Sequence, residues 1–154
     1  MKKITLQRLK NIALFYLERY DASSEKLRQT LKRRVAKARL EQDVSPEAVS
    51  WIETVVEEMQ RLGYVNDERF AENMVRRLSA SGKSPNTIRI KLKMAGIKEG
   101  IIANVLSETD ELSQARLMVQ KKHMGADFYR DLARLARAGF SYDVARQALE
   151  EMLD

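Results

Sequence analysis

Apolar residues recur at three- and four-residue steps along most of this 154-residue chain. The first segment illustrates the pattern, because Leu6, Leu9 and Ala13 fall on one stripe of a helix over about residues 6–20. A stripe with this period is typical of an α-helix that buries one face. Eight further segments carry the same period, and no segment alternates convincingly as a β-strand would. The pattern therefore predicts an all-α fold of about nine helices.

Short polar residues and glycines indicate where these helices begin and end. Ser84 with Pro85 predicts a helix start, because a serine side chain caps the exposed N–H groups and proline needs no partner in the first turn. Gly96 predicts the end of the same helix, since glycine readily adopts the left-handed conformation that follows a helix. By the same signals the other helices from the second onward begin near Ser23 or Ser24, Ser45-Pro46-Glu47, Asn66 or Asp67, Lys98, Asp110, Asp127 and Ser141, and glycines close several of them at Gly63, Gly82, Gly125 and Gly139.

An internal repeat groups the helices in threes. The period is 43 or 44 residues in the second half of the chain and 61 between the first unit and the second. A shift of 43 places Leu92, Gly96, Ile97, Ile101 and Leu106 on Leu135, Gly139, Phe140, Val144 and Leu149, and a shift of 61 places Leu27 and Leu31 on Ile88 and Leu92. We expect one domain of three tandem three-helix repeats, at about residues 6–63, 66–107 and 110–153, in an elongated, curved arrangement. The third repeat departs from the register, because Asp131 falls where Ile88 predicts an apolar residue.

Charge is distributed in blocks rather than evenly. The net charge is +6, but residues 1–40 carry +9, residues 41–72 carry −7, residues 73–98 carry +7 and residues 99–154 carry −3. Blocks of opposite charge of this size favour a fold in which residues of one charge sign form a surface that binds an oppositely charged partner. A polyanion such as DNA is the leading candidate for the basic surface, although solvated helix faces without a partner would give the same composition.

The basic residues concentrate on the outer faces of four predicted helices, the second, fourth, fifth and eighth. The second helix holds seven Lys or Arg between residues 26 and 39 and no acid. These like charges repel one another along the helix, so the arrangement is unfavourable until an anion neutralises the positive charge. On the eighth helix three arginines form one row along about two turns, which could follow phosphates or an acidic protein groove, or could simply face solvent. The candidate nucleic-acid or filament-binding residues are Lys26, Arg28, Lys32, Arg33, Lys37, Arg76, Arg77, Lys83, Arg89, Lys91, Lys93, Arg130, Arg134 and Arg137.

Residues 62–97 resemble the signature of the RecX family, the bacterial regulators of the RecA recombinase. The matching elements are Leu62-Gly63-Tyr64-Val65-Asn66-Asp67 with Arg69-Phe70-Ala71, Gly82-Lys83-Ser84-Pro85, Ile88-Arg89, and Leu92-Lys93-Met94-Ala95-Gly96-Ile97. The resemblance implies an all-helical protein of three three-helix repeats that binds RecA filaments on DNA and inhibits their activities. Its expected partners are the RecA filament and single- and double-stranded DNA.

The alternative function is a helix-turn-helix transcription regulator with Ser84–Gly96 as its recognition helix. Few Asn, Gln or Ser residues face outward on that segment, although such residues would favour base recognition.

Catalysis has little support, since the chain has one histidine, His123, no cysteine, and neither a phosphate-binding loop nor a nucleophilic triad. We therefore expect a non-enzymatic, cytoplasmic monomer that uses no cofactor or metal and does not enter a membrane.

Overall fold

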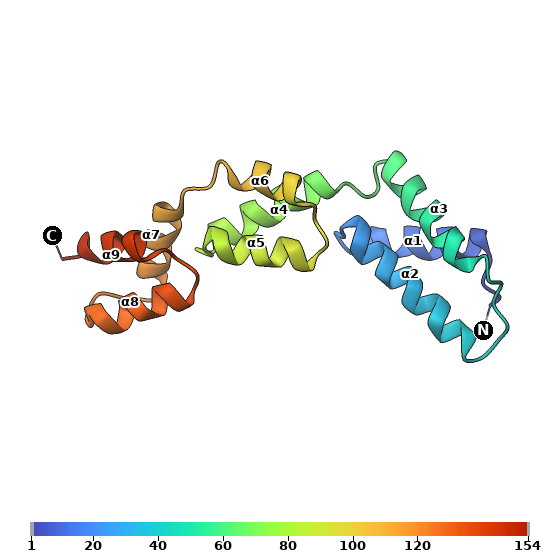
Figure 1. The fold of residues 1–154 in the computed structure, drawn as a ribbon, viewed down its shortest axis with the longest axis horizontal. Helices are drawn as coiled ribbons and strands as arrows, with labels where there is room; N and C mark the ends of the chain where they lie inside the picture. Colours follow the sequence, from blue (N-terminus) through green and yellow to red (C-terminus); the bar gives the residue numbers. More distant parts are fainter. Residues whose placement is uncertain (1, 154) are drawn as a thin grey trace. The chain divides into compact units, whose positions relative to one another are not determined.

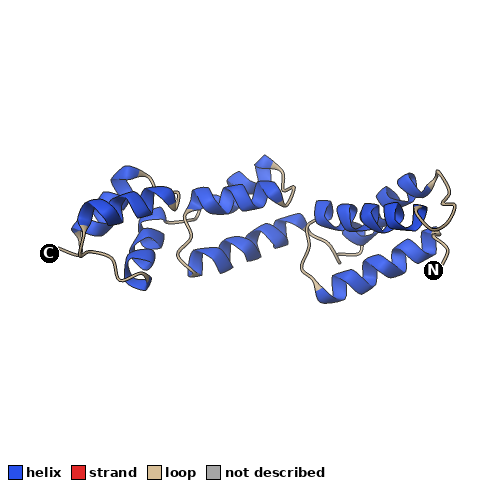
Figure 2. Cartoon of the chain, turned by 90° about the horizontal axis from the view of Figure 1, so that it is seen from below, coloured by secondary structure: helices blue, strands red, loops and turns tan. Residues whose placement is uncertain are grey.

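The computed structural model describes residues 2–153, and within this range the chain is all-α, with nine helices and no strand (Figures 1 and 2). The predicted fold class is confirmed. The helices are α1 (Leu6–Arg19), α2 (Ser24–Arg39), α3 (Ala48–Arg61), α4 (Asp67–Ala80), α5 (Pro85–Met94), α6 (Glu99–Leu106), α7 (Glu111–Lys121), α8 (Phe128–Arg137) and α9 (Tyr142–Glu150).

The described residues form two compact units. Unit one comprises the residues up to Phe70 together with Ala95–Ile97, and unit two comprises Ala71–Met94 and the residues from Lys98 onward. Within unit one, α1, α2 and α3 pack against one another (Figure 1). Within unit two, α5 packs on α6, and both α7 and α8 pack on α9. The sections below describe each unit by itself.

The core of unit one is built from the inward stripes of its three long helices. Leu9, Leu27, Leu31 and Ile52 are almost fully buried in it. Each such side chain contributes about 1.5–3 kcal/mol through removal from water. Val49 lies at helical spacing from Ile52 and Val56, and the sequence pattern therefore predicts that it faces inward, but this prediction is wrong, since the residue is 56% exposed. Val49 follows the buried Ala48 by one residue, and one residue turns a helix by roughly 100°, which places it beside the stripe.

The start of α3 also differs from the prediction. Ser45 does not cap a helix with Pro46 in its first turn; the helix begins at Ala48, and the N-cap residue Glu47 makes no side-chain cap bond. The hydroxyl of Ser45 instead accepts a hydrogen bond from the backbone N–H of Glu47 at 3.2 Å. A serine that binds backbone two residues ahead stabilises a local turn, which here delays the helix.

The predicted caps in unit two are confirmed at three helix starts. Ser84 Oγ accepts from the backbone N–H of Thr87 at 3.1 Å, and Pro85 is the first residue of α5. Asp110 and Asp127 cap α7 and α8 in the same way. Behind these starts, an apolar cluster that includes Leu135 and Leu149 forms the core between α7, α8 and α9.

Two serine N-caps form the same tertiary contact at repeat-equivalent positions. In unit one, the buried Ser23, which caps α2, donates its hydroxyl hydrogen to the carbonyl oxygen of Ala95 at 2.6 Å. In unit two, the buried Ser84, which caps α5, donates to the carbonyl oxygen of Ala138 at 2.9 Å. Each hydroxyl therefore satisfies a helix N–H and a carbonyl at the end of another helix, and we call this arrangement the serine–carbonyl junction.

A glycine follows the acceptor residue in both junctions. Gly96 and Gly139 have φ values of +79° and +99°, which side chains rarely tolerate. A Cβ on Gly96 would lie 2.5 Å from Cβ of Glu25, and a Cβ on Gly139 would lie 2.6 Å from Oγ of Ser84. The glycines thus end their helices and also allow the close approach on which each junction depends.

Candidate nucleic-acid interface

The outer face of α2 carries a dense set of exposed cations. The apolar stripe of α2 holds Leu27, Leu31 and Val35 in the core and so turns the intervening basic residues to solvent. The exposed members are Lys26, Lys32, Arg33, Arg34, Lys37 and Arg39. None of these six forms an ion pair with any residue from 2 to 153. Their positive charge is therefore available to an external anion.

Arg28 is the exception on α2. Its guanidinium is half-buried and donates from Nε to Glu53 of α3 at 2.5 Å, and it also pairs with Glu25. The hydrogen bond to Glu53 raises the pKa of Arg28 above its ordinary value, and the hydrogen bond to Glu25 adds to this effect, against the opposing effect of burial. The sequence predicts Arg28 as a binding residue, but in this structure its charge is compensated by two carboxylates, and it links α2 to α3.

The predicted binding residues of α4, of α5 and of the turn between them lie in unit two, and all are exposed. Lys93 pairs with Glu99 at 2.8 Å, and this contact lowers the pKa of Glu99. The other five residues form no ion pair within the described range; they are Arg76, Arg77, Lys83, Arg89 and Lys91. The apolar side chain of Met94 is 79% exposed on the same helix, so the outer surface of α5 is not purely ionic.

The arginine row of α8 is organised by a buried acid. Asp131 is fully buried at the position that is apolar in the other repeats, so the predicted repeat register holds although the residue type differs. Its carboxylate accepts from the backbone N–H of Gly125 at 2.8 Å and from Arg134 at 3.2 Å, and Arg130 lies 3.7 Å away. The Gly125 bond is the main cause that lowers the pKa of Asp131, with the two arginines adding to it. Only Arg137 of the row is free of an ion pair in the described part of the chain.

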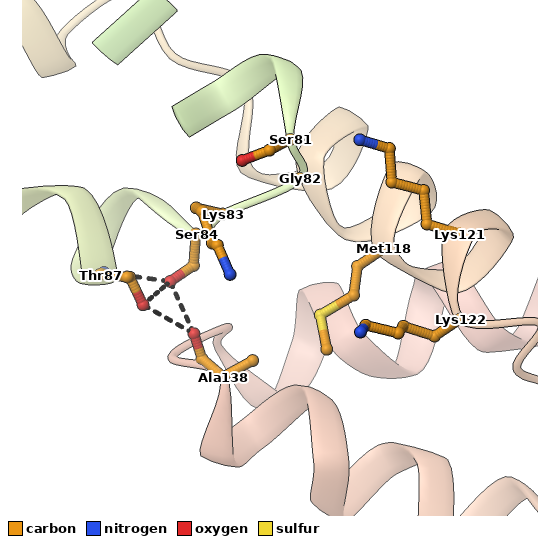
Figure 3. A pocket seen from close by; sticks show the side chains of 9 residues that line it. All are labelled: Ser81, Gly82, Lys83, Ser84, Thr87, Met118, Lys121, Lys122 and Ala138. Carbon is orange, nitrogen blue, oxygen red and sulfur yellow. Dashed lines mark hydrogen bonds between the residues drawn. The ribbon is translucent and has the colours of Figure 1, made fainter. Parts of the chain in front are cut away.

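A pocket of about 170 Å³ lies in unit two beside the serine–carbonyl junction (Figure 3). It brings Lys83 of the α4–α5 turn together with Lys121 and Lys122 at the end of α7. The last two are not among the sequence-predicted binding residues, because the turn and the end of α7 are distant in the chain and no local pattern links them. The lining consists of Ser81, Gly82, Lys83, Ser84, Thr87, Met118, Lys121, Lys122 and Ala138.

Similarity to known proteins is extensive. The model of a family described as RecX, second three-helix domain, matches residues 66–106. A regulatory protein RecX from Myxococcus xanthus is 34% identical over 164 residues, which cover 97% of this chain and 88% of that relative. The chain belongs to the RecX family.

Other RecX proteins resemble the chain over different extents. A RecX from Corynebacterium efficiens is 34% identical over 123 residues, covering 67% of this chain and 59% of that relative. The crystal structure of RecX from Lactobacillus salivarius matches with a TM-score of 0.75 and 21% identity, over 95% of both chains. At that identity, the structural match supports the RecX fold of helical repeats.

The RecX second three-helix domain contains six of the predicted binding residues, from Arg76 to Lys93. The six exposed cations of α2 lie outside that matched range. No helix in the described residues of this RecX-family chain is both long and apolar enough to cross a membrane.

Proposed function

We propose that this chain is a non-enzymatic regulator that binds RecA filaments on DNA and inhibits RecA recombinase activities. The observation that supports this best is the outer face of α2, where six exposed cations lack an ion pair among residues 2–153. Exposed like charges on one helix repel one another, so a polyanion that neutralises them is bound favourably. Membership of the RecX family supports a RecA-containing filament as the source of that polyanion.

The proposed contact with DNA is electrostatic and independent of sequence. Lysine and arginine contacts to phosphates position a protein on DNA without reading the bases. Such binding weakens steeply as salt rises, because neutralised phosphates release counterions. We therefore expect similar affinity for unrelated DNA sequences and a strong salt dependence for both single strands and duplexes.

A helix-turn-helix transcription regulator that uses Ser84–Gly96 for recognition is less well supported. Recognition helices place their N-terminal residues against base edges in the major groove. At the N-terminus of α5, Ser84 is buried, and the hydroxyls of Ser84 and Thr87 both donate to Ala138 O at 2.9 Å. That end of the helix is therefore engaged by α8 and is not free to enter a groove.

The test measures binding to random single-stranded and duplex DNA at two salt concentrations, with and without a RecA filament. A second assay follows RecA ATPase activity as the chain is added in substoichiometric amounts. We expect sequence-independent, salt-sensitive binding and a decrease in ATPase activity. Preference for one duplex sequence, together with unchanged ATPase activity, would instead support the transcription regulator.

A further inference from the structure

We propose that the pocket beside the serine–carbonyl junction of unit two binds a single unstacked pyrimidine base of single-stranded DNA, with the adjoining phosphates on Lys83 and Lys122. This inference rests on the proposed function, since it assumes that the chain binds DNA. It adds a specific site for one nucleotide to the otherwise unspecific electrostatic contact.

The size of the pocket matches one aromatic ring. Its volume is about 170 Å³. An apolar cavity of about 150 Å³ is enough to hold benzene, whereas sites for larger organic ligands occupy about 300–1,000 Å³. One six-membered ring therefore fits, and the larger fused rings of a purine fit less well.

The floor of the pocket suits a ring better than a phosphate. The hydroxyls of Ser84 and Thr87 both donate to the carbonyl oxygen of Ala138, so neither offers a free donor to an anion. The half-buried side chain of Met118 also lines the pocket. A methionine sulfur makes favourable contacts with aromatic rings.

The rim supplies positive charge for the phosphates on either side of the base. Lys121 donates to the carbonyl oxygen of Ala80 at 3.2 Å. Lys83 and Lys122 are exposed, form no ion pair within the range that the structure describes, and extend toward the space beside Met118 from opposite sides (Figure 3). A base enclosed here would therefore have an ammonium group near each neighbouring phosphate.

Only an unpaired strand can fill such a site. In a duplex the base is stacked and paired, and moving it out of the helix costs a few kcal/mol per base. A single strand presents its bases with a far smaller cost, and proteins commonly hold them against apolar or aromatic surfaces. The pocket therefore predicts that unit two distinguishes bases from a bare phosphate chain in single strands only.

The test compares the full chain's affinity for a thymidine oligomer and for an abasic oligomer of equal length and charge. We expect the thymidine oligomer to bind about 2- to 10-fold more tightly, from one sulfur–aromatic contact. Met118→Gln, which keeps the length of the side chain but makes it polar, should abolish the difference, whereas Met118→Leu should retain more of it. Replacing Lys83 and Lys122 together with alanine should weaken binding of both oligomers.

The outcomes separate this inference from the proposed function. Equal binding of the two oligomers, or a thymidine preference that Met118→Gln leaves unchanged, would overturn the pocket while DNA binding itself stands. Failure to bind either oligomer would reject the DNA contact and the pocket together. Thymidine monophosphate that competes as well as the oligomer, per nucleotide, would show a free-nucleotide site and would overturn the assignment to a strand.

Discussion

The outer face of α2 allows a quantitative prediction for DNA binding. Lys32, Arg33 and Lys37 are exposed and have no ion pair in the part of the chain that the structure describes. We consider their combined replacement by glutamine, which removes three positive charges and keeps side chains of moderate length. Arg28 is left unchanged, because its replacement would leave Glu53 without its partner.

The expected loss of affinity follows from counterion release. On single-stranded DNA, each phosphate that is neutralised contributes a slope of about −0.7 to log K against log salt concentration. If each of the three side chains neutralises one phosphate, the variant's slope is smaller by about 2, and its affinity near 0.1 M salt is lower by about 100-fold. Stability should change by no more than about 0.5 kcal/mol, because exposed, unpaired positions tolerate substitution.

The assay is fluorescence anisotropy with a labelled random single strand, at several salt concentrations, with circular dichroism melting of each variant. A matched control replaces Arg61, Arg116 and Arg146 with glutamine; this removes the same charge from exposed residues that already pair with Glu58, Glu151 and Glu150. Because charges beyond about 10 Å are screened at this salt concentration, we expect the control to lose less than about tenfold. Equal losses and equal slopes for the two triple variants would refute a localised α2 contact.

Three further predictions concern unit two. Asp131→Ala should cost about 1–3 kcal/mol at neutral pH, because the half-buried N–H of Gly125 loses its acceptor. Since the folded-state pKa of Asp131 is lowered, this contribution to stability exists above the unfolded pKa and is lost as pH falls below about 4. The free energies of urea unfolding of the two proteins should therefore converge in acid. Gly139→Ala should cost at least about 1–3 kcal/mol from its positive φ, and a neutral or stabilising result in thermal melts would contradict the junction geometry. Gly100→Ala is the matched control: this glycine lies in a helix with open space around it, so the substitution should raise the stability by about 0.5–1 kcal/mol. Ser84→Ala should lose about 1–2 kcal/mol in the same melts, and a neutral result would show that the cap and the bond to the carbonyl are not needed.

Local features of the fold can be predicted from the sequence because their physical causes are local. The start of α5 depends on Ser84 and Pro85, and its end depends on Gly96, all within residues 84–96. The inward stripes follow from the helical period in the same way. Val49 shares the helical period of Ile52 and Val56, so the sequence pattern includes it in the stripe, whereas in the structure the buried face is centred on Ala48, Ile52 and Val55.

The state of the charged residues is much less predictable, since it depends on partners from other helices. Arg28 looks like its neighbours in the sequence, yet Glu53 of α3 compensates its charge. In the sequence, Asp131 departs from the apolar pattern of the repeat, but the backbone N–H of Gly125 donates a hydrogen bond that stabilises the buried carboxylate. Lys83 lies close to Lys121 and Lys122 only in the folded chain, so their spacing in the sequence does not predict that they line one pocket.

Few substitutions can remove the hydrogen bond of the serine–carbonyl junction. Its acceptors, the oxygens of Ala95 and Ala138, belong to the main chain, so an exchange of either alanine leaves the acceptor in place. In both junctions the contact depends on the identity of the serine that donates and of the glycine that follows the acceptor residue, and in unit two Thr87 also donates to the same carbonyl oxygen. Two or three residues therefore maintain each junction, and the exposed residues outside it can change in charge without removing these hydrogen bonds.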